Sequence, residues 1–388
     1  MNSFIPYGKQ SLDEDDINSV IEVLKSPFLT TGPKIEEFEN KICEYTNAKY
    51  CVAVSNGTAA LHLASLVLLE KKDKVLTTVN SFVATSNSIL YVGANPIFVD
   101  IEENGNIDLD LCEEKLKKDS SIKAIYVVHF SGNLVNQEKL KYLRNKYNIK
   151  IVEDCAHSLG ATFKEIKAGS CVNSDCSILS FHPVKHITTG EGGAVTTNSK
   201  EIYEKLLQLR AHGINRVNFK NDNMAKDIKG NINPWYYEMH YLGFNYRITD
   251  FACALGLSQL KKVDTFIKNR KNIALKYDIA FKNTLVKPLY DFDESSSYHL
   301  YVVSVDFKKL NITKAELFNK MKNKNIGLQL HYMPINKQPF YKDLGYGDEK
   351  TPIMDKYYQE CFSLPMYPTL TSEEQEYVIK NLLEVLSA

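Results

Sequence analysis

The sequence predicts an α/β fold: a mostly parallel central sheet flanked by helices, with a smaller α+β unit at the C-terminal end. From about residue 50, short apolar stretches alternate with amphipathic helical patterns, which is typical of βαβ units. The 388 residues are enough for two domains of ~100–200 residues each. The composition, with 44% hydrophobic and 24% charged residues, is that of a globular protein and argues against a disordered or coiled-coil chain.

The expected strands are short, apolar and bounded by polar or glycine-containing turns. They are Tyr50–Val54, Lys74–Thr78, Pro96–Val99, Ala124–Val128, Lys150–Glu153, Ser177–Phe181 and Ala194–Thr197. The helices between the first five strands centre on Leu61–Leu69, Ser86–Val92, Leu109–Leu116 and Gln137–Tyr147. Strands that alternate with helices in this way pair in parallel, because each crossover returns the chain to the same edge of the sheet.

Both ends of the chain predict further helices. The pattern Ser11-x-x-Glu14 is a capping box that would begin a first helix, and Thr31-Gly32-Pro33 would separate it from a second. A long helical pattern from Ile248 to about Lys271 would lead into a unit with a strand at Leu300–Val305 and a helix at Lys314–Lys322. We therefore expect residues 1–250 to form the N-terminal segment and large domain, and residues 251–388 the linking helix and small domain.

The charge balance and the cysteines limit the location and the partners. The chain has 47 Lys and Arg and 47 Asp and Glu residues, so nothing predicts binding to nucleic acid or to an acidic membrane. No apolar run reaches the ~20 residues of a membrane helix, and the N-terminus lacks the pattern of a signal peptide. The eight cysteines are scattered without a CxxC pair, as in reduced intracellular proteins. We expect a cytoplasmic protein.

Asp154 stands at the end of an expected strand, in Ile151-Val152-Glu153-Asp154-Cys155-Ala156-His157. Open α/β sheets bind ligands at the carboxyl ends of their strands, so this carboxylate is a candidate site residue. An aspartate at this position can equally be a helix N-cap or a turn residue. The position alone leaves both interpretations open.

Lys185 lies in Ser180-Phe181-His182-Pro183-Val184-Lys185-His186, between an expected strand and the run Gly190-Glu191-Gly192-Gly193. A solvated lysine has a pKa of about 10.4 and is protonated at neutral pH. Covalent chemistry requires this pKa to be lowered by burial or by nearby positive charge. The apolar surroundings of Lys185 are compatible with burial, and a solvated loop lysine is the alternative.

The turn Ser55-Asn56-Gly57-Thr58 follows a strand and opens a helix. Free backbone N–H groups at a helix N-terminus attract anions, and Gly57 would let a phosphate approach closely. The alternative is that Thr58 only caps the helix. Phe82, after the next strand, offers an aromatic ring at a sheet edge, and its alternative is a place in the core.

In chain order, an anion-binding turn, an aromatic residue, a strand-end aspartate and a lysine describe a pyridoxal-phosphate site. The sequence resembles the DegT/DnrJ/EryC1/StrS family of sugar aminotransferases, from Ile5-Pro6-Tyr7 to the last helix. The segment Ser180-Phe181-x-x-x-Lys185 is the most specific element of this resemblance. The resemblance implies the fold of the type I aspartate aminotransferases and pyridoxal 5'-phosphate as the cofactor.

The resemblance also implies a role for each cofactor-binding residue. Lys185 would hold the cofactor covalently as a Schiff base and then move a proton between substrate and cofactor carbons. Asp154 would face the pyridine nitrogen and keep it protonated, so that the ring is an electron sink. His157 would contact the ring or its phenolic oxygen. Gly57, Thr58 and Ser180 would hold the phosphate, and Phe82 would stack on the ring. Asn56 is the remaining residue expected to bind the cofactor.

The resemblance implies a homodimer with shared active sites, because Asn245 would reach the cofactor phosphate of the neighbouring subunit. The segments His182–Lys185, Thr188–Gly193 and His331–Ile335 are similar to the pseudaminic-acid subgroup of the family. That likeness implies transfer of an amino group from L-glutamate to C4 of a UDP-linked 4-keto-6-deoxy-N-acetylhexosamine. The implied substrate contacts are Tyr7, Leu29, Thr30, Thr31, Gly32, His182, His331, Tyr332, Met333 and Pro334.

Other classes of protein fit the sequence less well. It has neither the G-x-G-x-x-G of nicotinamide dehydrogenases after its first strand nor a P-loop. His182-x-x-x-His186 copies a helical metal-ligand spacing, but Pro183 disfavours a helix and no further ligands follow, so we expect no metal. An aminotransferase for another nucleotide-linked keto sugar (bacillosamine, legionaminic or dTDP-sugar type), a pyridoxal-phosphate-dependent sugar dehydratase and a regulator on the same fold stay open. In such dehydratases a histidine replaces the lysine, so Lys185 favours transamination.

Overall fold

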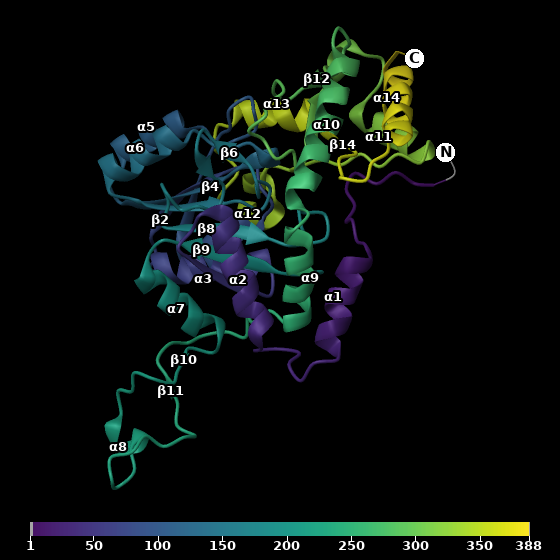
Figure 1. Cartoon of the computed structure of the whole chain (residues 1–388). Helices are drawn as coiled ribbons and strands as arrows, with labels where there is room; N and C mark the ends of the chain where they lie inside the picture. The colour runs from purple at the N-terminus through teal and green to yellow at the C-terminus, as the bar shows by residue number, and fades with distance from the viewer. Residues whose placement is uncertain (1–2, 388) are drawn as a thin grey trace.

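A seven-stranded sheet lies at the centre of the computed structural model, which describes residues 3–387 (Figure 1). Its strands are β1 Tyr50–Val54, β2 Lys74–Thr78, β3 Asn95–Val99, β4 Ile122–Val128, β5 Lys150–Asp154, β8 Cys176–Ser180 and β9 Gly193–Thr197. They are ordered β1-β9-β8-β5-β4-β2-β3. Strand β9 is antiparallel to both of its neighbours, and all other neighbours pair in parallel. The predicted mostly parallel sheet is confirmed.

Helices cover both faces of this sheet, because successive residues of a buried strand point to opposite sides. One face packs against α3 Gly57–Leu68, α4 Ala84–Tyr91 and α7 Lys200–Arg210. The other face packs against α2 Pro33–Thr46, α5 Leu109–Lys118, α6 Gln137–Tyr147 and α9 Asp250–Leu260. Within β5, Ile151 belongs to the core of the second face and Val152 to that of the first.

The start of the first helix differs from the prediction. Helix α1 Glu14–Leu24 is capped by Asp13, whose side chain accepts the Asp16 N–H while the Asp16 carboxylate accepts the Asp13 N–H. The predicted capping box at Ser11 and Glu14 is therefore wrong. Tertiary contacts select Asp16, because Gln259 Nε2 lies 2.7 Å from its carboxylate and Lys262 Nζ 2.8 Å. The predicted break before α2 is confirmed, since Gly32 caps that helix and Pro33 begins it.

The C-terminal part has a sheet and a core of its own. Strands β12 Lys287–Pro288, β13 Tyr301–Ser304 and β14 Cys361–Leu364 pair antiparallel. Helices α10 Val263–Phe281, α11 Lys314–Asn323 and α14 Ser372–Ser387 pack around this sheet, together with Ile5 from the N-terminal segment. Helices α12 Pro339–Asp343 and α13 Pro352–Glu360 instead join a cluster that includes Phe98 of β3 and Phe130, which follows β4. The division of the chain at residue 250 stays a prediction.

The long helix expected from Ile248 to about Lys271 is two helices, α9 and α10, separated at Lys261 and Lys262. The Lys262 N–H bonds to the Gln259 carbonyl, which makes a tight turn in place of another α-helical turn. The Lys262 ammonium lies 2.6 Å from Asp13 and 2.8 Å from Asp16 at the start of α1. This ion pair fixes the turn at a place that the helical periodicity alone did not reveal.

Two hairpins were not predicted from the sequence. One is small, with β6 Thr162–Phe163 and β7 Ile166–Lys167. The other belongs to an arm, residues 214–242, that leaves the body of the chain at the lower left of Figure 1. The arm contains β10 Ile214–Asn215, the short helix α8 Asp222–Ala225 and β11 Glu238–Met239.

The structure also describes the state of the cysteines and the length and composition of the helices. All eight cysteines are free, and seven of them are buried. Within residues 3–387, none of the helices combines the length and the apolar composition that crossing a bilayer requires.

Candidate functional site

A cavity of about 1030 Å³ opens where β4, β5 and β8 end, beside the N-termini of α3 and α4. This is where open α/β sheets bind ligands. Tyr7 and the segment Gln329–Tyr332 line another part of its wall. The structure brings twelve predicted site residues together here: Tyr7, Asn56, Gly57, Thr58, Phe82, Asp154, His157, Ser180, His182, Lys185, His331 and Tyr332. Their individual roles stay predictions.

Asp154 is the last residue of β5, and its buried carboxylate faces the cavity. Its Oδ2 accepts a hydrogen bond of 2.7 Å from the Thr85 hydroxyl, and Oδ1 accepts the Ala156 N–H at 3.0 Å. The Thr85 hydroxyl lies 2.8 Å from that of Ser81. Asp154 thus makes the hydrogen bond to a nearby N–H that is expected of a turn residue. It also presents a fixed carboxylate to the cavity.

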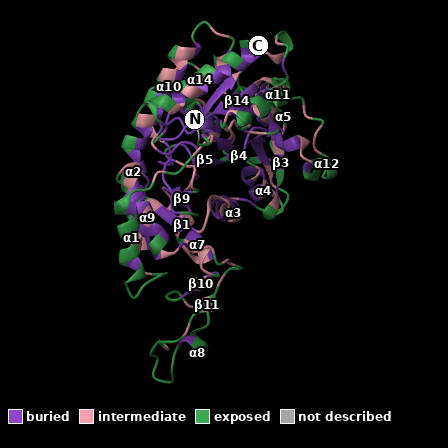
Figure 2. Cartoon of the chain, turned by 90° about the vertical axis from the view of Figure 1, so that its right-hand side faces the viewer, coloured by how far each residue is buried: buried purple, intermediate pink, exposed green. Residues whose placement is uncertain are grey.

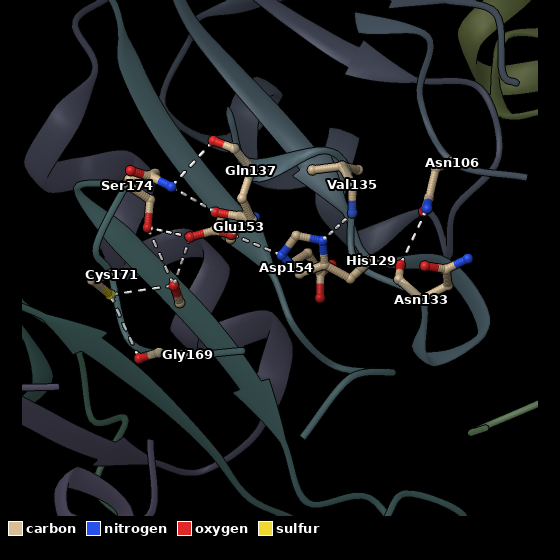
Figure 3. Close-up of polar contacts among 12 residues, drawn as sticks. Asn106, His129, Asn133, Val135, Gln137, Glu153, Asp154, Gly169, Cys171 and Ser174 are labelled. Atoms are coloured by element: carbon tan, nitrogen blue, oxygen red, sulfur yellow. Dashed lines mark hydrogen bonds and ion pairs between the residues drawn. The ribbon is translucent and has the colours of Figure 1, made fainter. Parts of the chain in front are cut away.

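Glu153, the neighbour of Asp154, points to the other face of the sheet, where it is the centre of a buried polar network (Figure 3). Its Oε2 lies 2.8 Å from His129 Nε2 and from Gln137 Nε2, and its Oε1 accepts a hydrogen bond of 2.5 Å from Ser174. His129 Nδ1 accepts the Val135 N–H, so Nε2 carries the proton that is donated to Glu153. The network thereby holds the end of β5, and with it Asp154, in place.

Removing the charge of Glu153 should lower stability at neutral pH. Burial alone would raise the pKa of Glu153, but hydrogen bonds from His129, Ser174 and Gln137 hold it below its ordinary value. Since this pKa is lower in the folded chain, the stabilisation is present at neutral pH and is lost as the pH falls through the folded value. We expect Glu153→Gln to lower the free energy of unfolding by roughly 2–4 kcal/mol at pH 7 and by less in acid.

Urea unfolding at both pH values measures this loss. Glu114→Gln is the matched control, because the Glu114 side chain is 60% exposed on the neighbouring helix α5. If both variants lose the same stability, or if the loss from Glu153→Gln does not shrink in acid, the network does not stabilise the strand end as described.

Lys185 lies in the loop after β8, half-buried and facing the cavity. Burial lowers the pKa of Lys185 to about 8, and the charge of Arg270 lowers it further, while the charge of Asp154 opposes both. Its side chain makes no hydrogen bond or ion pair within residues 3–387. An amine with a pKa near 8 is neutral often enough at physiological pH to react as a nucleophile.

The N-terminus of α3 forms an anion cradle. The Asn56 side chain caps the helix by accepting the Ala59 N–H, so Thr58 is not the cap. In the described chain the Gly57 and Thr58 N–H groups make no hydrogen bond, and both residues line the cavity. A Cβ at Gly57 would lie 3.1 Å from Ser180 Cβ, so glycine keeps the turn against β8. Unpaired N–H groups beside hydroxyls fit a phosphate.

Histidine and tyrosine rings form another part of the wall. His157 Nε2 lies 3.0 Å from the Tyr332 hydroxyl, and the His157 ring lies 4.3 Å from that of His299, between centroids. Burial holds the pKa of both histidines well below the ordinary value, so both are neutral. Within the described chain, His157 Nδ1 is buried without a hydrogen-bond partner, so this side of the wall can accept a polar group.

His331, Tyr7 and Phe82 are also in the wall. The His331 Nδ1 lies 2.8 Å from the Ser363 hydroxyl, and burial, together with the charge of Lys185, lowers the pKa of His331 to about 3. The Tyr7 ring lies 5.2 Å from that of His331. Phe82 is 59% exposed at the mouth, with its ring 6.3 Å from that of Tyr332. Phe82 is therefore not a core residue.

Several residues near the cavity were missed from the sequence, because their neighbours in space are far away along the chain. Thr85, Tyr246 and His299 line the cavity. Arg270 is fully buried on α10, and its Nη1 donates to the carbonyl oxygens of Tyr298, His299 and Met366 at 3.0–3.3 Å. It therefore fixes the backbone that carries His299. From the sequence alone, Arg270 could be recognised only as a charged residue within a helix.

Six of the expected substrate contacts do not line the cavity of this chain: Leu29, Thr30, Thr31, Gly32, Met333 and Pro334. The first four lie at the start of α9, because the Asp250 carboxylate accepts the N–H groups of Gly32, at 2.8 Å, and Lys34, at 3.0 Å. Met333 is exposed and Pro334 is buried beside the cavity wall. A contact of Leu29–Gly32 with substrate stays a prediction.

Asn245 also lies outside the cavity of its own chain. Phe244 and Tyr246 turn inward and pack on His62, with ring centroids 4.9 and 5.9 Å from it. Alternate residues of an extended segment point to opposite sides, so Asn245 turns outward and is exposed. The alternative, that Asn245 satisfies its own turn, finds no support, because its side chain makes no hydrogen bond within residues 3–387.

His182 and His186 do not form a metal site. His182 is exposed at the cavity, whereas His186 is buried with its Nε2 3.1 Å from the Ser297 carbonyl oxygen. No group of three or more histidine, cysteine or acidic side chains is placed to hold a metal ion anywhere in residues 3–387.

Known proteins share both the sequence and the fold of this chain. It is 40% identical over 385 residues to the UDP-4-amino-4,6-dideoxy-N-acetyl-beta-L-altrosamine transaminase of Campylobacter jejuni, covering 98% of this chain and 97% of that protein. The structure of Helicobacter pylori PseC, an aminotransferase involved in the biosynthesis of pseudoaminic acid, superposes with a TM-score of 0.90 at 32% identity, over 99% of this chain and 100% of that one.

A third relative has been solved with the cofactor. The PLP form of the sugar aminotransferase Spr1654 from Streptococcus pneumoniae superposes with a TM-score of 0.88 at 28% identity, over 99% of both chains. The sequence profile described as the DegT/DnrJ/EryC1/StrS aminotransferase family matches residues 10–383. The chain therefore belongs to the DegT/DnrJ/EryC1/StrS aminotransferase family, a family of enzymes that depend on pyridoxal phosphate.

Proposed function

We propose that this enzyme transfers the amino group of L-glutamate to C4 of a UDP-linked 4-keto-6-deoxy-N-acetylhexosamine. The product would be UDP-4-amino-4,6-dideoxy-N-acetyl-β-L-altrosamine, an intermediate of pseudaminic acid biosynthesis. The observation that carries the proposal is a lysine of lowered pKa in the same cavity as a strand-end aspartate and a helix N-terminal anion cradle. The relatives from Campylobacter and Helicobacter support the choice of sugar.

The residues of the cavity fit pyridoxal phosphate. The unpaired N–H groups of Gly57 and Thr58, next to the Ser180 hydroxyl at the helix end that Asn56 caps, would hold the phosphate. Asp154 would face the ring nitrogen, Lys185 would hold the cofactor covalently, and Phe82 and His157 would contact the ring. When bound, the cofactor supplies an electron-accepting ring that stabilises negative charge on the substrate carbon.

The protein's own residues account for the proton transfers. With a pKa near 8, roughly one-tenth of the Lys185 amine is neutral at pH 7, so its Nζ can both take up and return a proton. Asp154 keeps its position because Thr85 and the Ala156 N–H bind its two oxygens. Tyr7, His182, His331 and Tyr332 line the same cavity and would orient the sugar.

A substrate panel tests the proposed function. The purified protein, which should be yellow, is incubated with glutamate and a set of UDP- and dTDP-linked keto sugars, and NMR identifies the aminated carbon. We expect amination at C4 of the UDP-linked 4-keto-6-deoxy-N-acetylhexosamine. Amination of a dTDP sugar in preference would replace the proposed substrate, and loss of a hydroxyl without amino transfer would identify a dehydratase.

The proposal includes a cytoplasmic homodimer with shared sites. The outward direction of Asn245 supports a role in the site of a partner subunit, and the free cysteines support a reducing compartment.

Subunit exchange tests the shared site. Lys185→Ala and Asn245→Ala proteins are each expected to be impaired. In a mixed dimer both substitutions would fall in one site and leave the other intact. Mixing the two proteins should therefore restore activity above that of either parent, up to about one wild-type site per mixed dimer. If mixed dimers form and activity does not return, Asn245 serves its own chain.

A further inference from the structure

His186 follows Lys185 directly in the chain, but its side chain is buried outside the cavity wall. Its Nε2 lies 3.1 Å from the Ser297 carbonyl oxygen. A carbonyl oxygen only accepts hydrogen bonds, so Nε2 carries the proton and is the donor. Burial, together with the charge of Arg270, holds the pKa of His186 well below the ordinary value, so the imidazole is neutral.

This hydrogen bond joins the lysine loop, residues 182–188, to a distant part of the chain. The loop is otherwise closed on itself, because the Phe181 carbonyl oxygen accepts the Thr188 hydroxyl at 3.1 Å and the Thr189 N–H at 3.0 Å. In the part of the chain that the structure describes, no other hydrogen bond or ion pair leads from the lysine loop to a segment outside residues 180–192. The bond from His186 therefore sets where the loop lies.

Ser297 is a fixed anchor for the loop. It is fully buried, in residues 295–300, the segment that leads into β13. Its N–H bonds to the Gly132 carbonyl oxygen after β4, at 3.1 Å, and its hydroxyl donates to the His157 carbonyl oxygen after β5, at 3.3 Å. The ends of both strands are buried inside the body of the chain (Figure 2). Ser297 is thus tied to the carboxyl ends of two strands of the large sheet.

The segment 295–300 is also held from the side of α10. Arg270 Nη1 donates to the carbonyl oxygens of Tyr298 and His299, at 3.3 and 3.1 Å. A Cβ at Gly132 would lie 2.7 Å from the Tyr298 nitrogen, so glycine allows the segment to lie against the loop after β4. The anchor is therefore held between α10 and the sheet.

A continuous chain of contacts joins Asp154 to Lys185. The Asp154 carboxylate accepts a backbone N–H of the turn that carries His157. The His157 carbonyl oxygen accepts the Ser297 hydroxyl. The Ser297 carbonyl oxygen in turn accepts His186, the neighbour of Lys185. Because Asp154 and Lys185 would hold the same cofactor, the reacting atoms stay aligned only if the distance between these two residues is kept.

We infer that His186 is a positioning residue of the proposed amino transfer: its hydrogen bond to Ser297 holds the Lys185 amine at a fixed place relative to Asp154. The inference rests on the role of Lys185 in the proposed function and adds what places that lysine. Without this bond the lysine loop is free to move away from the segment 295–300, and the Lys185 amine becomes hydrated.

Three substitutions separate this role from a general contribution to folding. His186→Phe keeps a planar ring but removes the donor, and it removes no charge because the imidazole is neutral. His186→Gln restores a side-chain N–H donor at about the place of Nε2. Thr188→Val is the matched control, because Thr188 is buried in the same loop and its hydroxyl bonds to the nearby Phe181 and Gly190 instead of to a distant segment.

Amine labelling of Lys185 measures its hydration without substrate or turnover. Full-length protein, freed of cofactor with L-cysteine, reacts with trinitrobenzenesulfonate over a pH series, and peptide mapping gives the extent of reaction. Burial lowers the pKa of Lys185 to about 8, so the wild-type midpoint should lie near pH 8. His186→Phe should move the midpoint toward about 10.4, because hydration favours the charged amine. His186→Gln and Thr188→Val should leave it near pH 8.

The other titratable groups around Lys185 are the same in all of these proteins: Asp154, Arg270, His157, His299 and His331. A change in the midpoint therefore reports the place of the amine. Lys314 is an internal standard, because burial also lowers its pKa to about 8 and it lies outside the cavity. Its midpoint should not change.

Turnover gives a second readout. His186→Phe should lower kcat by roughly 10-fold with the KM for glutamate within about twofold, since a displaced amine impairs the steps after binding. His186→Gln should return kcat to within about threefold of wild type. The inference is overturned if His186→Phe keeps the wild-type midpoint, if His186→Gln moves it as far as His186→Phe does, or if Thr188→Val moves it equally.

Ser297→Ala decides the matter if circular dichroism shows that His186→Phe does not fold. It keeps the carbonyl group that His186 binds and removes the hydroxyl bond to His157, so the midpoint should rise by a smaller amount. Combined with a folded His186→Phe it should add nothing, because both act through one chain of contacts. An unchanged midpoint in Ser297→Ala, or additive effects, would overturn the inference. Labelling needs no sugar, so this test and the substrate panel can fail independently.

Discussion

Replacing Lys185 by alanine is expected to abolish amino transfer, by at least ~10³-fold, while the chain still folds. The loss is large because no other amine lines the cavity within the described residues. Folding should persist, since the Lys185 side chain makes no hydrogen bond or ion pair within residues 3–387. Activity with the substrate panel and circular dichroism measure the two outcomes.

Covalent labelling identifies the lysine directly. Borohydride reduction of the yellow wild-type protein, followed by peptide mapping, should fix the cofactor to Lys185. Lys314 provides a matched control, because burial also lowers its pKa to about 8 although it lies outside the cavity, bonded to the Tyr358 carbonyl. A label on Lys314 would mean that a low pKa alone directs the reaction. A label on any lysine other than Lys185 would contradict the assignment of Lys185 as the residue that holds the cofactor.

The second large effect is expected from Asp154→Asn, which should lower turnover by roughly 10²–10³-fold and cofactor occupancy by much less. In the proposed site Asp154 would face the ring nitrogen, so without the carboxylate that nitrogen would lose its ionic partner and the proton that would make the ring an electron sink. The cofactor should still bind, because the Gly57 and Thr58 N–H groups and Ser180 are unchanged. Absorbance gives the occupancy and the substrate assay gives turnover.

Asp100→Asn is the matched control for this change. Asp100 also follows a strand of the large sheet and is buried, but its carboxylate accepts the N–H groups of Ile353 and Met354 at the start of α13. Its substitution should cost stability and leave the turnover of the folded protein nearly intact. If Asp154→Asn behaves in the same way, Asp154 is only a structural turn residue.

The sequence alone predicted most of the large sheet, because buried parallel strands are short apolar runs between turns. Strands β1 and β2 begin and end at the predicted residues, and β5 differs from its prediction by one residue. Lys185 and Asp154 could be found in the same way, since each stands at a fixed place relative to a strand end. Gly32 and Pro33 likewise marked the start of α2 by their local backbone preferences.

Contacts between distant segments decided what the sequence could not show. Asp13 rather than Ser11 caps α1, because Lys262 and Gln259 bind the acidic pair from 240 or more residues away along the chain. Leu29–Gly32 lie outside the cavity because Asp250 holds them at the start of α9. Thr85 and His299 reach the site only when α4 and the segment before β13 pack against the end of β5. The local sequence determined which strands and turns form, whereas the tertiary structure decided which side chains meet, because hydrogen bonds and ion pairs between remote segments exist only after the chain has packed.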